Sequence, residues 1–200
     1  VEVTNNVNVL SNVVTKAYVA AAAIAGGQVG AAAGVALVFN RTAVDTFIKR
    51  GANVVAKTIN VNAQTDCGAY AFIITVAAGI VGAGACVAYV QNALDVNTYA
   101  GVKNGTTVTG TNADSGCLTA KDIYVTAVGT GTSKVNGYAV AGGLVGANGI
   151  VALSFNAVKS VSAIRGIGVN STGTAKVSSK IDGNAFVDAL SVAGGLVGAG

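Results

Sequence analysis

The stretch that decides the fold is Gly-Gly-Gln-Val-Gly-Ala-Ala-Ala-Gly-Val-Ala-Leu-Val-Phe-Asn, residues 26–40. Its Val-Gly-Ala segment at 29–31 returns at 81–83, 145–147 and 197–199, so successive copies lie 52, 64 and 52 residues apart. Self-similarity at a fixed period indicates a repeat architecture, in which each unit buries its apolar face against its neighbours. We therefore expect residues 1–200 to form a single segment built from units of about 52 residues.

The longer second spacing predicts an insertion. The run Val44-Asp45-Thr46-Phe47 matches 96–99 at an offset of 52, whereas Ala56-Lys57 matches 120–121 at an offset of 64. The 12 additional residues must therefore lie between Tyr99 and Ala120. We assign them to a polar, Gly-rich inserted loop at 104–116, because insertions into repeats map to loops that often form the binding face. The expected units span approximately 14–66, 67–133 and 134–184, with a partial unit at 185–200.

The alternation of apolar and polar residues favours strands. In 58–63 and again in 122–127 the apolar side chains fall on odd-numbered positions, as in a strand with one buried face. The chain contains no Pro, which suits uninterrupted hydrogen-bond ladders. We predict an all-β protein, a parallel β-helix or β-solenoid. We interpret each 52-residue unit as two rungs of about 26 residues, which would give roughly eight rungs and a rod of about 40 Å.

An integral membrane protein is the alternative interpretation. Three stretches, 17–40, 67–94 and 135–158, carry no charge and are long enough for Gly/Ala-rich transmembrane helices. Clustered Gly weakens a helix, however, and no aromatic belt brackets these stretches in the sequence. We therefore rank the solenoid first.

The repeat predicts two ladders of stacked side chains. Val29, Val81, Val145 and Val197 should form an inward-facing column, with successive members two rungs apart. Asn40, Asn92 and Asn156 follow the first three valines by 11 residues, and we expect them to stack as an amide ladder or turn at a strand end. A binding role for these asparagines is the less favoured interpretation.

One strand of each unit is apolar on both faces. In 35–39, Val35, Leu37 and Phe39 lie on one side, and Ala36 and Val38 on the other. A strand of this kind is covered on both sides. Either another copy covers it by lateral packing through Leu37, Tyr89 and Leu153, or segments of the 17–25 type form a second internal layer. Open rung ends would also allow end-to-end stacking into filaments. We expect the isolated chain to self-associate.

Composition excludes many kinds of chemistry. The chain has no His, Met, Trp or Pro, so a Ser-His-Asp triad and a His-based zinc site are excluded. Twelve basic residues against eight acidic ones give a net charge of +4, but the basic residues are scattered and form no nucleic-acid-binding patch. The acidic residues form no recognisable acid–base or calcium motif. We expect no catalytic residues, no metal, no cofactor and no small-molecule substrate, and hence a protein that is not an enzyme.

The three cysteines, Cys67, Cys86 and Cys117, have no CxxC spacing. They are interpreted first as small buried hydrophobic residues, and second as including a Cys67–Cys117 disulfide. The sequence leaves both readings open.

The repeat resembles a known family. The run at 26–40, a following Val-x-Thr-aromatic strand and the segment Val-Val-Ala-Lys-Thr-Ile-Asn-Val-Asn-Ala at 54–63 look like large bacterial surface exoproteins of the leukotoxin-like and filamentous-haemagglutinin-like type. This resemblance covers nearly the whole chain. It implies a β-helical stalk that is secreted to the bacterial cell surface, adhesion to a host or bacterial surface receptor, or filament formation. The cysteines and the 12-residue insertion depart from the family pattern.

Overall fold

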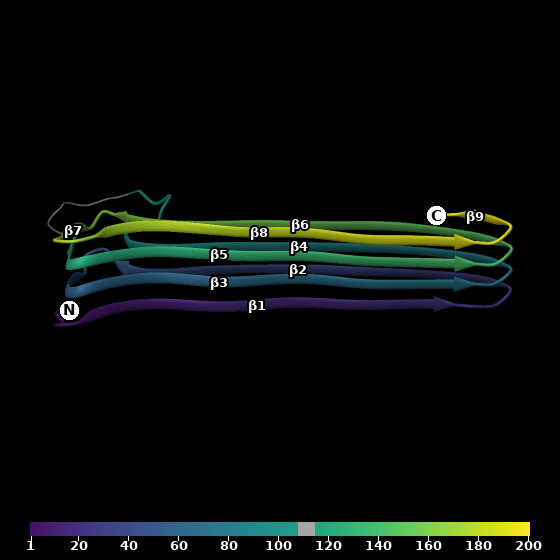
Figure 1. The fold of residues 1–200 in the computed structure, drawn as a ribbon, viewed down its shortest axis with the longest axis horizontal. Coiled ribbons are helices and arrows are strands. Elements are labelled where there is room, and N and C mark those ends of the chain that lie inside the picture. Colours follow the sequence, from purple (N-terminus) through teal and green to yellow (C-terminus); the bar gives the residue numbers. More distant parts are fainter. Residues whose placement is uncertain (108–114) are drawn as a thin grey trace.

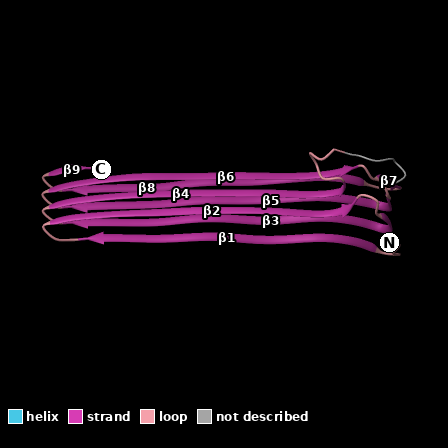
Figure 2. Ribbon diagram, turned by 180° about the vertical axis from the view of Figure 1, so that it is seen from behind, coloured by secondary structure: helices cyan, strands magenta, loops and turns pink. Residues whose placement is uncertain are grey.

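The chain winds into a flat solenoid with two long strands in every coil (Figure 1). The computed structural model describes residues 1–107 and 115–200. One strand runs the length of the molecule, a tight turn reverses the chain, and the next strand returns along a second sheet (Figure 2). The strands are β1 (Asn6–Ala25), β2 (Val29–Lys49), β3 (Asn53–Ala78), β4 (Val81–Gly101), β5 (Cys117–Gly142), β6 (Val145–Arg165), β7 (Gly168–Ser171), β8 (Ala175–Gly194) and β9 (Val197–Ala199).

The strands alternate between two parallel sheets. Sheet A contains β1, β3 and β5 in this order, with β7 and β8 both pairing with β5. Sheet B contains β2, β4, β6 and β9. Because the sequence repeats, each strand pairs in parallel with the equivalent strand of the next unit, and like residues lie side by side. The predicted all-β solenoid is confirmed.

The assignment of two rungs to each unit is wrong. Val29 pairs directly with Val81, and Asn6 pairs directly with Thr58, so one 52-residue unit makes a single coil. The 26-residue half of the unit is one strand with its turn. The strands have 20–26 residues in the complete coils, far beyond the usual 3–10. At about 3.3 Å per residue they are roughly 65–85 Å long, while four stacked levels measure only about 15 Å between the outermost strands.

Alternation of inward and outward side chains along the strands produces the core. In β3 the inward residues are Val54 and Ala56 at the start of the strand and the odd-numbered residues from Ile59 onward, of which Ile59, Val61 and Ile73 are fully buried. In β4 the even-numbered residues point back towards sheet A, so that Val90 and Val96 are also fully buried. Most core side chains are Val, Ala, Cys or Thr, because the two sheets lie close together over their whole length. The core is therefore one thin, mostly apolar layer between two sheets.

The transmembrane-helix alternative is contradicted by the structure. Each uncharged stretch, 17–40, 67–94 and 135–158, consists of the end of a sheet A strand, a glycine-containing turn and the start of a sheet B strand. Within the described residues, the search for a helix long and apolar enough to span a bilayer found none.

The register also locates the additional residues of the second unit. Lys49 pairs with Gly101 at an offset of 52, and Asn53 pairs with Cys117 at an offset of 64. The 12 residues therefore enter the turn between β4 and β5. Of the predicted loop 104–116, residues 108–114 lie outside the described part of the chain. At its base, Val102 N donates to Arg165 O at 2.8 Å, and Gly51 N donates to Ser115 O at 3.0 Å, so that both neighbouring coils contact it.

Candidate functional site

The valine column exists, but it faces outward. Val29 pairs with Val81, Val81 with Val145, and Val145 with Val197, one level apart rather than two. All four are exposed, and Val29 has 71% of its surface accessible. The predicted inward orientation is wrong because the glycine after each valine occupies the inner position. A Cβ at Gly82 would lie 2.7 Å from Gly142 O, so only glycine fits where the chain leaves the turn and β4 begins.

The asparagine ladder lies inside the molecule. Asn40 pairs with Asn92, and Asn92 with Asn156, near the middle of the sheet B strands rather than at their ends. Asn92 is completely buried. Its Nδ2 donates to Asn156 Oδ1 at 3.0 Å and to Cys67 O at 3.1 Å, and its Oδ1 accepts from Cys67 Sγ at 2.8 Å. The amides thus join both sheets, and the stacked-ladder interpretation is confirmed.

The cysteines form no disulfide. Cys67, Cys86 and Cys117 all lie in described strands as free thiols. Cys117 is in register with Asn53, fourteen positions before Cys67 along the strand direction, which is about 45 Å. The Cys67–Cys117 bridge is therefore excluded by distance. Cys67 belongs to the asparagine network, where its Sγ also accepts from Asn40 Nδ2 at 3.1 Å. Burial raises the pKa of the Cys86 thiol.

Leu37, Tyr89 and Leu153 form one column on the outside of sheet B. Leu37 and Leu153 have 51% and 44% of their surfaces exposed, and Tyr89 is partly exposed. The predicted internal second layer does not cover them. Instead Ala17, Val19 and Ala21 of β1 pack on the inner side of sheet B, against a cluster containing Ala36 and Val38. The outer apolar face is therefore left open to solvent.

This outer surface carries no charge over half the length of the strands. We call it the uncharged face and define it as the outward side chains of residues 29–39, 81–91 and 145–155. Aromatic rings join its strands: Tyr89 lies 5.4 Å from Phe39 and 5.5 Å from Phe155 between ring centroids. Between Val29 and Val35, and in the equivalent positions of β4 and β6, small residues leave a shallow depression of about 370 Å³.

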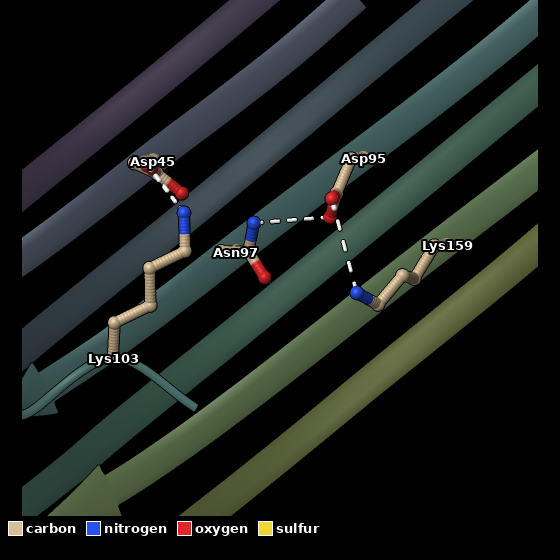
Figure 3. A network of polar contacts seen from close by, with 5 residues as sticks. All are labelled: Asp45, Asp95, Asn97, Lys103 and Lys159. Atoms are coloured by element: carbon tan, nitrogen blue, oxygen red, sulfur yellow. Dashed lines mark hydrogen bonds and ion pairs between the residues drawn. The ribbon is translucent and has the colours of Figure 1, made fainter. Parts of the chain in front are cut away.

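Charged side chains occupy the other half of the same surface (Figure 3). Lys103 Nζ lies 2.8 Å from Asp45 Oδ2, and Lys159 Nζ lies 3.8 Å from Asp95 Oδ2. Asn97 Nδ2 donates to Asp95 Oδ1 at 3.0 Å. The hydrogen bond to Asp45 raises the pKa of Lys103. These groups are exposed pairs on a solvated surface, and they separate the uncharged face from the turn that carries the insertion.

Sequence reasoning missed the small residues that form the depression. Ala31, Ala33, Ala83 and Ala85 are all exposed on the outer side of sheet B, where an isolated alanine carries no signal of function. Their position beside the large residues of the same strands could have been found by writing the units one above another. In the described part of the chain, no three His, Cys, Asp or Glu side chains converge as metal ligands would.

Comparison of the chain with protein-family models, with curated proteins and with solved structures gave no match.

Proposed function

We propose that this chain is a non-enzymatic structural and adhesive segment of a secreted bacterial adhesin or extracellular filament. The observation that carries the proposal is the uncharged face, which continues across three stacked strands of sheet B. At about 3.3 Å per residue and 4.8 Å per strand it covers roughly 500 Å². Soluble monomers rarely expose contiguous apolar patches beyond a few hundred Å² unless the patch binds something.

The core supports a mechanical role. Every interior strand is paired along its length on both sides, and the inward-facing amides of Asn92 and Asn156 tie the two sheets together. Such a stack can be lengthened coil by coil without changing its cross-section. It presents the same outward residues at each level, which suits repeated weak contacts with another copy or with a receptor on a host or bacterial surface.

An adhesion assay tests this proposal. The chain would be displayed on a non-adherent bacterium through a fused outer-membrane anchor, and retention on cultured epithelial cells would be measured under flow. We expect retention above that of the anchor alone. The triple variant Leu37→Lys, Tyr89→Lys, Leu153→Lys should be displayed equally well and retained less. Equal retention of the anchor alone and the wild-type chain would refute the adhesive role.

A further inference from the structure

We propose that two copies of this chain pack back to back through their uncharged faces, related by a two-fold axis at the Val35, Val87 and Val151 column. The axis runs parallel to the direction in which the strands stack. Each strand therefore lies over the equivalent strand of the other copy, and the two run in opposite directions. This inference rests on the proposed self-associating role and names the geometry of the partner. The partner is a second copy of the same chain.

The middle strand shows why the axis lies at this column. The outward-facing residues of β4 differ in size on the two sides of Val87. The bulky Tyr89 and Gln91 lie on one side, and Ala85 and Ala83 lie at the same distances on the other. Rotation about Val87 therefore places Tyr89 of one copy over Ala85 of the other, and Gln91 over Ala83. Each large side chain meets a small one.

The first strand of sheet B has the same pattern about Val35. Leu37 and Phe39 lie on one side of it, and Ala33 and Ala31 lie at equal distances on the other. Both large residues are well exposed, with 51% and 65% of their surfaces accessible. The rotation sets Leu37 over Ala33 and Phe39 over Ala31 of the other copy.

The third strand repeats the pattern about Val151. Leu153 and Phe155 are matched by Gly149 and Ala147. Three strands with different residues thus keep one arrangement of large opposite small. The alanines among these small residues line the depression of about 370 Å³, and the large residues form the ridge that would fill it. The ring contacts from Tyr89 to Phe39 and Phe155 connect the ridge across all three strands.

The same rotation leaves the ion pairs in water. Arg41 lies six residues beyond Val35, and Val29 lies six residues before it, so the rotation places Arg41 over Val29 of the other copy. Sheet B of that copy begins at Val29, and the contact therefore ends at Arg41. Asp45 with Lys103, and Asp95 with Lys159, lie beyond that boundary. Burying unpaired charge at an interface is costly, and this arrangement buries none of these four.

The buried area suits a specific but modest dimer. The overlap from column 29 to column 41 measures about 40 Å by 14 Å, or roughly 1,100 Å² in total over both copies. That value exceeds the minimum of about 1,000 Å² for a specific interface and lies just below the range of stable ones, which begins at about 1,200 Å². Because the axis follows the stacking direction, each coil contributes its own share of contact.

The outer face of sheet A offers no equivalent surface. Its corresponding half carries Lys134 and Asp188, and the Asp188 carboxylate accepts a hydrogen bond from Tyr138 at 3.0 Å. On this face there is also no central column with large residues such as Tyr70 and Phe72 on one side and a row of small residues at the same distances on the other.

A reciprocal size swap tests the proposal, with the molecular mass measured by sedimentation equilibrium over a range of concentrations. We expect the wild-type chain to be a dimer in the micromolar range. Ala85→Tyr should set tyrosine against Tyr89 and weaken the dimer at least about tenfold, and Tyr89→Ala should also weaken it by opening a gap. The double variant Ala85→Tyr, Tyr89→Ala restores large opposite small and should dimerise within about threefold of wild type.

Matched controls separate this geometry from general stickiness. Ala20→Tyr adds the same side chain on the outer face of sheet A and should leave the dimer unchanged. Thermal unfolding of each variant should confirm that the fold is retained, since all these positions face outward. A monomeric wild type would overturn the proposal. So would Ala85→Tyr strengthening association, or the double variant failing to recover while folded.

These outcomes are independent of the adhesion assay. If the chain adheres to cells but is monomeric in solution, the proposed dimer is refuted and the adhesive role is supported. If the chain dimerises and the Ala85→Tyr, Tyr89→Ala variant recovers the dimer as expected, but the chain does not adhere, the dimer is supported and the adhesive role is refuted.

Discussion

The side-chain amide of Asn92 donates to Oδ1 of Asn156 at 3.0 Å, across two neighbouring strands of sheet B. The same Asn92 is bonded on its other side to the thiol and carbonyl of Cys67 in sheet A. A fully buried amide satisfied in this way fixes the register within a sheet and the alignment between the sheets, because an unpaired buried polar group is costly.

Replacing Asn92 by Ala should therefore destabilise the chain by about 3 kcal/mol, since it creates a gap and leaves the Cys67 thiol and Asn156 Oδ1 without this partner. Urea unfolding measures the change in the free energy of unfolding. Gln64→Ala, an exposed amide on the outer face of sheet A, is the control and should change it by less than about 0.5 kcal/mol. Equal effects of the two substitutions would show that the ladder is not a source of stability.

The glycine turns give a second prediction. Gly82→Ala should cost about 2 kcal/mol or more, because the new Cβ would lie 2.7 Å from a backbone oxygen of Gly142 and the sheets would have to separate. Gly142→Ala is the matched control, since a Cβ there meets no atom within 4 Å. Thermal unfolding of both variants checks the difference. If Gly82→Ala does not lower the melting temperature, the backbone at Gly82 cannot approach Gly142 as closely as the structure shows.

Thiol reactivity gives a third prediction. Cys67 and Cys86 are fully buried and the pKa of Cys86 is raised, so both should react slowly with Ellman's reagent in the folded chain. Cys117 is only partly buried and should react first. Cys117→Ser should remove the fast phase, and urea should make the two buried thiols reactive. Fast reaction of all three thiols in the native chain would contradict the two-sheet core.

The insertion gives a fourth prediction. Deleting 105–116 joins Asn104 to Cys117 and leaves a three-residue turn equivalent to Arg50-Gly51-Ala52, because Gly101 is in register with Lys49 and Cys117 with Asn53. Gly51 has a φ of 85°, which disfavours Lys103 at the equivalent position. Deletion alone should lower the melting temperature by a few degrees, and adding Lys103→Gly should restore it. Collapse of both variants would show that the insertion belongs to the core.

The repeat and the alternation within it were enough to predict the class of fold. The 52-residue spacing of Val29 and Val81 required like residues to stack, and the pattern around Ile59 and Val61 required strands. The number of strands per coil could not be obtained in this way. The repeat period gives the sequence separation of residues that stack on each other. It does not give the number of strands and turns that the chain makes between them.

The candidate site was predicted only in part. The apolar pattern on both sides of strand 35–39 leaves two alternatives for Leu37, an outer face that another copy covers or an internal second layer, and the structure shows that Leu37 is exposed within the single chain. The repeat alone predicts the wrong orientation for Val29, since only the close approach of Gly30 to Ala78 at the turn shows that the glycine takes the inner position. Cys67 and Cys117 are candidates for a bridge in sequence, whereas in space they occupy distant points of the same sheet.

By itself, the sequence determined that this chain stacks equivalent strands in parallel, because near-identical units provide one another with hydrogen-bond partners and matching side chains. Only the tertiary structure decided that each unit is one coil of two very long strands, and that the valines face water while the asparagines face the interior. The physical reason is that the sequence period constrains pairing within a sheet, whereas inside and outside are set by how closely the two sheets approach, and that distance depends on both sheets at once.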